Sequence, residues 1–355
     1  MTAALPPAAE VGSIACLMLG AIGDLLVTTP TIRALRAAYP AARLTVILRH
    51  ELAPLAQGNP CVDEVLAFRS GGAWRKAAFL ATLARRRFDL WVDLHVPTFN
   101  TFGSNDAVFR RNALMMRVAR SRYRLGYAAP ALAPHLTHAV PVPDDAVFAA
   151  ENIVASTLRI VDGDPGGARK ELPPADATTR AAASALLGAD AGPVVGLFFG
   201  SNQPAGVWPR ARVAELCRAL PAALPGHRFA LLGGPAERTT AAAVMEEHGI
   251  GRFLDLVARC ALPVTAEVMR RCAAVVATDS GPMHMADALG VPLVALFAAK
   301  NPLPLWLPLS PAARVLHHDV DCRRCLLSVC PRGNLCLDLI SPADVIDALR
   351  DRLAK

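Results

Sequence analysis

The sequence contains little lysine, few aromatic residues and no long apolar run. Only four of its 355 residues are Lys, although Lys and Arg together number 37. Aromatic residues make up 5% of the chain, too few for the stacking platforms that hold single-stranded nucleic acids, so we expect no nucleic-acid partner. No stretch of about 18 apolar residues occurs, and we therefore expect no transmembrane helix.

We also expect no signal peptide, because the first ten residues lack a basic group and residues 14–19 form too short an apolar run. This predicts a cytoplasmic protein, which could also lie peripherally at the inner face of the cytoplasmic membrane. Nine cysteines are too few for a disulfide scaffold and agree with a reducing compartment.

Four of the cysteines cluster near the end of the chain with the spacing C-x2-C-x4-C-x5-C. A C-x2-C pair followed by two more thiols fits a zinc or iron–sulfur site, and reduced thiols without a metal are the alternative. The candidate ligands are Cys322, Cys325, Cys330 and Cys336.

Positive charge is concentrated in one segment of the chain. The formal net charge is +7, and residues 107–143 contain no acidic residue. Such a field attracts anions, either a phosphorylated sugar or an anionic membrane face, and a solvated helix face is the alternative. The cations of this stretch are Arg110, Arg111, Arg117, Arg120, Arg122 and Arg124, together with His135 and His138.

Short apolar strands alternate with helical patterns twice along the chain, which predicts two doubly wound α/β domains with parallel sheets. The breaker-rich segment 162–174 reads as a linker, so we place the domains at residues 1–170 and 171–355. In the first domain we predict strands at 11–19, 44–48, 62–68 and 89–94 and helices at 32–39, 74–87, 108–120 and 146–160. In the second we predict strands at 193–199, 228–232, 273–278 and 292–297 and helices at 178–187, 210–220, 235–248, 282–289 and 342–353.

A glycine-containing loop follows the first predicted strand, at the sheet edge where ligands of such folds bind. Gly20 and Gly23 allow close backbone approach and positive φ angles. Asp24 then either caps the next helix or acts as a general base. The loop gives G-x-x-G rather than G-x-G-x-x-G, so a nicotinamide-dependent oxidoreductase is a weaker alternative.

Three loops of the second half also follow strands and carry polar side chains. The first offers small groups to a phosphate, the second an acid that could accept hydrogen bonds from ribose, and the third a helix N-terminus suited to a pyrophosphate. Each has a plain structural alternative as a turn or helix-start residue. The residues concerned are Ser201, Asn202, Glu237, Asp279, Ser280, Gly281 and His284.

These loops, in this order, resemble glycosyltransferase family 9, the ADP-heptose:lipopolysaccharide heptosyltransferases. The resemblance is carried by LGAIGD at 19–24, TTPTIRALR at 28–36 and TDSGPMH at 278–284. It implies a GT-B fold, with two Rossmann-like domains facing across a cleft and the last helix packing back toward the first. It also implies inverting transfer of a sugar, most readily a heptose, from a nucleotide donor such as ADP-heptose to an anionic, lipid-linked, lipopolysaccharide-type acceptor. No metal or other cofactor is required in that chemistry.

The resemblance also implies roles for the loop residues. Asp24 matches the catalytic base, Glu237 the ribose-binding acid, and Ser201 and Asn202 the groups near the donor phosphates. The loop from Asp279 to His284 matches the second donor loop. The acid-free arginine stretch would then meet acceptor phosphates or the membrane.

The sequence departs from the family at one position. Family members usually have a phosphate-binding Lys two residues before the Trp-Pro pair, and this chain has Gly206 there. Arg210 and Lys300 are the candidate replacements. If neither reaches the phosphates, the alternative is a catalytically degenerate nucleotide-sugar-binding protein of the same fold.

Overall fold

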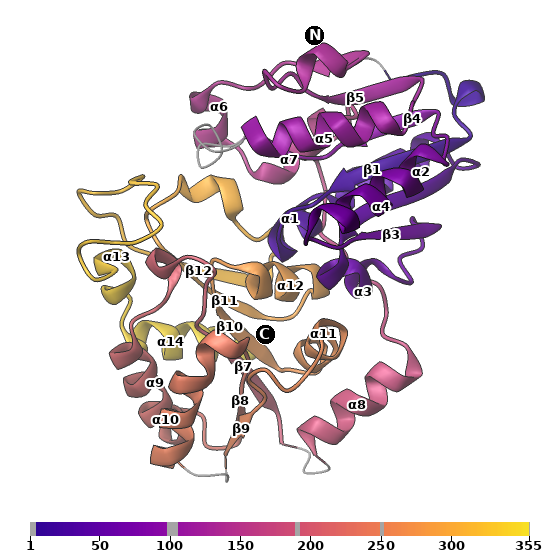
Figure 1. Cartoon of the computed structure of the whole chain (residues 1–355). Coiled ribbons are helices and arrows are strands. Elements are labelled where there is room, and N and C mark those ends of the chain that lie inside the picture. The colour runs from indigo at the N-terminus through magenta and orange to yellow at the C-terminus, as the bar shows by residue number, and fades with distance from the viewer. Residues whose placement is uncertain (1–4, 98–105, 189–191, 249–251, 355) are drawn as a thin grey trace. The chain divides into compact units, whose positions relative to one another are not determined.

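The computed structural model describes residues 5–97, 106–188, 192–248 and 252–354. It divides into two compact units, Met1–Pro174 and Ala175–Lys355 (Figure 1). Each unit contains a six-stranded sheet in which all the recorded strand pairs are parallel. The predicted α/β class is therefore confirmed.

The sheet of the first unit has the strand order β3-β2-β1-β4-β5-β6. Its strands are β1 Ser13–Met18, β2 Arg43–Arg49, β3 Glu64–Phe68, β4 Leu90–Asp93, β5 Tyr123–Tyr127 and β6 His138–Val140. Its helices are α1 Ile22–Val27, α2 Thr29–Ala38, α3 Ala53–Ala56, α4 Ala73–Ala84, α5 Asp106–Val118, α6 Asp145–Ala150 and α7 Ile153–Arg159. Helices α4 and α5 pack against each other, and α1, α2 and α7 form a second group. Because β1 and β4 are neighbours, the loops that follow them share one edge of the sheet.

Two features of this unit differ from the sequence-based expectation. The arginine-rich stretch contains strands β5 and β6, which its charged, weakly alternating sequence did not indicate. The single helix expected at 146–160 is two helices, and that prediction is wrong. Helix α6 ends at Ala150, and the Asn152 side chain accepts a hydrogen bond from the Val154 N–H to start α7. An Asn cap favours a new start over a continuous helix.

The sheet of the second unit has the order β12-β11-β10-β7-β8-β9. Its strands are β7 Val194–Phe198, β8 Arg228–Leu231, β9 Phe253–Asp255, β10 Ala274–Thr278, β11 Leu293–Phe297 and β12 Ala313–His317. Its helices are α8 Ala177–Leu187, α9 Arg210–Ala223, α10 Arg238–His248, α11 Leu262–Arg270, α12 Gly281–Leu289, α13 Leu335–Asp338 and α14 Pro342–Leu353. The outer strands β9 and β12 and helix α11 were not predicted.

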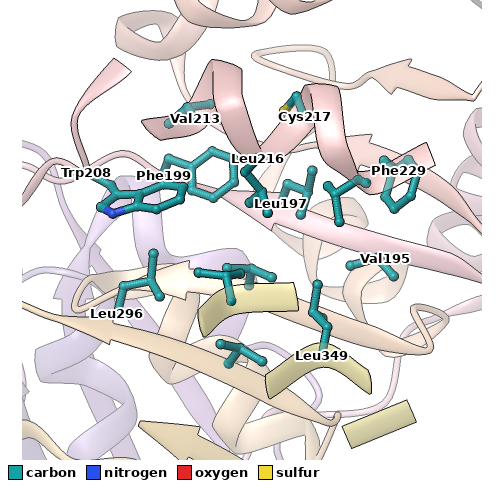
Figure 2. Close-up of a cluster of buried hydrophobic side chains, with 14 of the residues drawn as sticks. Val195, Leu197, Phe199, Trp208, Val213, Leu216, Cys217, Phe229, Leu296 and Leu349 are labelled. Carbon is teal, nitrogen blue, oxygen red and sulfur yellow. The ribbon is translucent and has the colours of Figure 1, made fainter. Parts of the chain in front are cut away.

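The core of the second unit anchors the loop that follows β7 (Figure 2). Trp208 is fully buried, its ring centroid lies 5.4 Å from that of Phe199, and its Nε1–H donates to the Leu337 carbonyl at 3.1 Å. Within the second unit, α14 packs against α9, β10, β11 and β12, and Leu349 is fully buried there. The packing of this last helix toward the first domain stays a prediction.

Within the described residues, no helix is long and apolar enough to cross a membrane.

Candidate active site

Asp24 lies in the first turn of α1, directly after β1. Its Oδ2 accepts a hydrogen bond from the Ala21 N–H at 2.7 Å, so the carboxylate caps its own helix. A Cβ on Gly20 would lie 2.5 Å from the Asp24 Cβ and 2.6 Å from Oδ2, which leaves room only for glycine. Oδ1 accepts no hydrogen bond from the described residues. Gly20 and Gly23 do not have the positive φ angles that we allowed for, and the role of Gly20 is close approach.

Glu237 is held in a matching way in the second unit. Its Oε2 accepts from the Gly234 N–H at 2.7 Å at the start of the helical turn after β8. A Cβ on Gly200 would lie 2.5 Å from the Glu237 Cδ and 2.9 Å from its Cγ. A Cβ on Gly233 would lie 2.9 Å from the Glu237 Cβ. Glycines at the ends of two neighbouring strands therefore make the space that this carboxylate occupies.

The loop after β7 is closely packed at Gly206, the position where a lysine was expected. Gly206 is buried, and a Cβ there would lie 2.6 Å from the Ser201 Oγ and 3.1 Å from its Cβ. A side chain at position 206 would thus require Ser201 to move. Ser201 Oγ accepts from the Gln203 N–H at 3.3 Å, and Asn202 is exposed.

The loop between β10 and α12 is tied to the loop after β7. Thr278 Oγ1 donates to the Gly200 carbonyl at 2.5 Å, and Ser280 Oγ donates to the Thr278 carbonyl at 3.0 Å. His284 is buried in α12, with its ring edge against Trp306 at a centroid distance of 5.8 Å. The structure therefore brings together loops separated by about 80 residues in the sequence. Thr278, which makes this connection, stands in the motif at 278–284, but the sequence assigned it no role because a buried threonine at a strand end carries no signal of its partner.

Lys300 follows β11 and is only 9% exposed. Its Nζ donates to the Gln203 Oε1, in the loop that also carries Ser201 and Asn202. Burial lowers the pKa of the Lys300 ammonium, and the nearby Asp279 carboxylate acts in the opposite direction. Lys300 thus places a cation between two of the predicted donor loops. Arg210, the other candidate, is exposed at the start of α9.

The cysteine-rich segment packs onto this part of the second unit. The Leu326 N–H donates to the Lys300 carbonyl at 3.0 Å, and Asn334 Nδ2 donates to the Pro204 and Val207 carbonyls at 2.8 Å. All four predicted cysteine ligands are free thiols. Within the described ranges, no three His, Cys, Asp or Glu side chains are arranged to hold a metal ion. The hydrogen bonds described above join this segment to the backbone at Pro204, Val207 and Lys300, in the loops that we expect to bind the nucleotide sugar.

A cavity of about 170 Å³ lies at the carboxyl ends of β7 and β8. Most of its lining residues are apolar, and they come from β7, β8, α9, α10 and the loops between these elements. Its polar lining residues include Ser201, Arg210, Thr240 and Glu237. An apolar hollow bounded by a few polar groups suits a flat, partly apolar ligand.

The arginines between residues 107 and 143 differ in what they contact: some bind other residues of the first unit, and others are exposed. Arg122 pairs with Glu10 at 2.6 Å, and its guanidinium stacks on Tyr123 at 4.8 Å. Arg124 donates to the His135 and Ser121 carbonyls. The other members, Arg110, Arg111, Arg117 and Arg120, lie on or just after α5, and all but Arg111 are exposed.

A buried polar cluster at the end of β4 was missed from the sequence. Asp93 is fully buried, and its Oδ1 lies 3.0 Å from the Nδ1 of His95. Asn112 Nδ2 lies 3.1 Å from the same ring nitrogen, and its Oδ1 accepts from Arg111 at 3.0 Å. Burial lowers the pKa of Arg111, and Asp93 opposes this effect. An Asp-x-His at a strand end was the available signal.

The model of the family described as glycosyltransferase family 9 (heptosyltransferase) matches residues 111–335, more than half of the chain. The chain belongs to glycosyltransferase family 9. It is therefore a glycosyltransferase, and the oxidoreductase alternative is set aside. The matched range of this family 9 chain contains every predicted donor residue, whereas Asp24 lies outside it.

Known proteins resemble this family 9 chain over nearly its whole length. Lipopolysaccharide heptosyltransferase 2 of Salmonella typhimurium is 28% identical over 318 residues, 83% of this chain and 85% of the relative. The structure of E. coli ADP-heptose lps heptosyltransferase II has a TM-score of 0.77 at 21% identity, covering 96% and 98% of the two chains. E. coli heptosyltransferase WaaC with ADP-2-deoxy-2-fluoro heptose has a TM-score of 0.68 at 17% identity, covering 96% and 99%. These structural likenesses confirm the predicted GT-B fold.

Proposed function

We propose that the protein transfers a heptose from ADP-heptose to an anionic, lipid-linked acceptor of the lipopolysaccharide type, with inversion and without a metal ion. The observation that carries the proposal is the gathering of Ser201, Glu237, Asp279 and Lys300 around one edge of the second sheet. The related E. coli heptosyltransferase WaaC has been solved with ADP-2-deoxy-2-fluoro heptose, and this supports ADP-heptose as the donor.

The second unit would bind the donor through complementary groups. Glu237 accepts hydrogen bonds from the ribose hydroxyls. The N–H groups of Ser280 and Gly281 open α12 and face the diphosphate, where a helix start favours negative charge. Ser201, Asn202 and His284 add hydrogen-bond donors. Lys300 supplies the buried positive charge, and Arg210 supplies a second, exposed one.

The first unit would supply the base and bind the acceptor. The acceptor oxygen forms a bond to the anomeric carbon from the face opposite the leaving group, while the bond from that carbon to the diphosphate oxygen breaks and its electron pair leaves with ADP. Asp24 takes the hydroxyl proton on Oδ1, because Oδ2 is engaged by the Ala21 N–H. Neutralisation of the departing diphosphate by Lys300 lowers the barrier. Exposed arginines of α5, with Arg111 and His95 beside them, would hold the acceptor's anionic groups.

The second candidate is a nucleotide-sugar-binding protein of the same fold that has lost catalysis. It is favoured by the lack of a lysine at Gly206, where Ser201 leaves no room for a side chain. The two candidates agree on donor binding and differ on transfer. If the protein binds ADP at Lys300 but does not release ADP from ADP-heptose, the second candidate is favoured.

The nucleotide preference tests the donor site by itself. At a concentration of about 100 times Kd, a bound ligand stabilises the folded state by about 2.7 kcal/mol, which raises Tm by about 4 °C for a chain of this size. We expect ADP-heptose and ADP-glucose to give such a shift and UDP-glucose to give none. A shift with UDP-glucose and none with either ADP-sugar contradicts the proposed donor.

The fit of Glu237 between glycines gives a second prediction. Gly200→Ala places a methyl group where the Glu237 carboxylate lies, so we expect ADP affinity to fall by at least about tenfold as that carboxylate is displaced. Gly226→Ala is the matched control, because a Cβ there meets nothing within 4 Å and ADP affinity should not change. Both Kd values come from isothermal titration calorimetry. Equal affinities for the two variants would remove Glu237 from the donor site.

A further inference from the structure

The start of helix α4 is exposed around its whole circumference. Residues 73–78 are all exposed, and they form the first turns of a helix whose later residues Phe79 and Leu83 are buried. Trp74 is 71% exposed, the largest value among the exposed large hydrophobic residues of the described chain. We call residues 69–78 the α4 tip. A tryptophan in this position buries almost none of its ring in the protein, so its apolar surface is available to a partner.

The α4 tip is strongly and uniformly cationic. Residues 65–88 contain six Arg and Lys and no acidic residue. Arg69, Arg75 and Lys76 are exposed beside Trp74, and the Arg75 guanidinium stacks on the indole at 5.4 Å. Glu64, just before this stretch, is engaged by Arg86 at 2.6 Å and by Arg43 at 3.3 Å.

Helix α5, which packs beside α4, also has exposed cationic side chains. Arg110, Leu114 and Arg117 are exposed and share one face of the helix, because they are spaced by four and three residues. Leu114 is 47% exposed. The buried faces of the two helices meet in one core, which includes Phe79, Leu83, Phe109 and Met116. The α4 tip therefore belongs to a helix that a shared core anchors, and the exposed cations of α5 stay assigned to the acceptor.

We propose that the α4 tip binds the surface of an anionic phospholipid bilayer. An indole is most stable at the membrane–water interface, where its ring meets acyl chains and its N–H meets headgroups. Each nearby Lys or Arg adds attraction to anionic lipids, about a fivefold gain in partition. A nucleic acid fits less well, because only one aromatic ring accompanies the cations. The inference does not depend on which sugar or nucleotide the enzyme uses.

The test is co-sedimentation of the full chain with vesicles of phosphatidylglycerol and phosphatidylethanolamine, without donor or acceptor. We expect binding to these vesicles, little binding to phosphatidylcholine vesicles, and loss of binding in about 0.5 M NaCl, where charges are screened beyond about 4 Å. Binding should shift tryptophan emission to the blue. Trp91 and Trp208 are already fully buried, so the shift should come from Trp74 rather than from the half-buried Trp306, and Trp74→Ala separates the two.

Two variants locate the surface. We expect Trp74→Ala to weaken partition on the order of tenfold and to abolish the emission shift. We expect Arg69→Gln/Arg75→Gln/Lys76→Gln to weaken it by about 100-fold. The control Arg238→Gln/Arg314→Gln/Arg323→Gln removes the same charge from exposed positions of the second unit and should bind as the wild type does. Because all of these side chains are exposed, unchanged Tm values should accompany the effects.

Other outcomes overturn the proposal. An equal loss in the control variant would mean that only the overall charge attracts the protein to vesicles. A dimer in sedimentation velocity that Trp74→Ala dissociates would assign the α4 tip to a second copy of the chain. Equally tight binding to double-stranded DNA that the tip variant loses would assign the surface to nucleic acid. Transfer activity toward a soluble acceptor is measured separately, so failure of the membrane inference and failure of the proposed function are distinguishable.

Discussion

Asp24→Asn is expected to lower kcat for sugar transfer by about 10³-fold and to leave ADP affinity unchanged. General-base catalysis contributes about 10² to 10⁴ to such rates, and an amide cannot take the acceptor's proton. Asn has the same shape, and its side-chain oxygen can still accept the Ala21 N–H, so the start of α1 should remain intact. Initial rates of ADP release at saturating donor and acceptor, with calorimetry of ADP binding, measure both quantities.

The control for this variant is another carboxylate that caps a helix. Asp144 accepts the Val147 N–H at 2.9 Å at the start of α6, in the same unit as Asp24. Asp144→Asn makes the same chemical change at a similar structural position and should retain full kcat. If Asp24→Asn retains kcat as well, Asp24 is only a cap. If it loses ADP affinity together with Tm, the effect is structural and the assignment as base fails.

Lys300→Met is expected to lower kcat by about 10² to 10³, the usual effect of removing one group that stabilises charge in the transition state. The charge on the diphosphate grows as its bond to the sugar breaks, so the loss should appear in kcat more than in the donor KM. Met fills nearly the same space without a buried charge, and Lys300 is only 9% exposed, so Tm should not fall. Steady-state kinetics over a range of donor concentrations separate kcat from KM.

Two further variants sharpen this result. Arg210→Met tests the other candidate cation, and we expect a smaller loss because Arg210 is exposed and screened by solvent. Lys170→Met removes another buried lysine, in the first unit, and should leave ADP affinity unchanged. A full loss in Arg210→Met with wild-type kinetics in Lys300→Met would transfer the phosphate role from Lys300 to Arg210.

The sequence was sufficient for the alternation of strands and helices and for the loops at the strand ends. Those signals are local: apolar runs, breakers and glycines recur in the order that two parallel sheets require. The edge strands β6, β9 and β12, and β5 beside β6, escaped because they are short and only partly apolar. The break between α6 and α7 could have been predicted, since Asn152 is a favourable helix cap.

The arrangement of the site needed the structure. The sequence showed that Gly206 stands where a lysine was expected, but the distance to Ser201 explains why a side chain there conflicts with the loop. Glu237 fits only because Gly200, from a different strand end, lacks a side chain. Lys300 was a candidate from its rarity alone, and its contact with Gln203 depends on a fold that brings two loops together. The clustering of the arginines in the sequence could not show which of them would form internal contacts and which would be exposed.

The most direct test of heptose transfer from ADP-heptose is the rate of that transfer by the wild-type protein, against which Asp24→Asn is compared. The full chain is incubated with ADP-heptose and a lipopolysaccharide acceptor that lacks heptose, with EDTA present, and both ADP and the acceptor's mass are followed. The account predicts that the acceptor gains one heptosyl group for each ADP released, with the anomeric configuration inverted. Tight ADP binding without release or transfer under these conditions would contradict it and leave a nucleotide-sugar-binding protein.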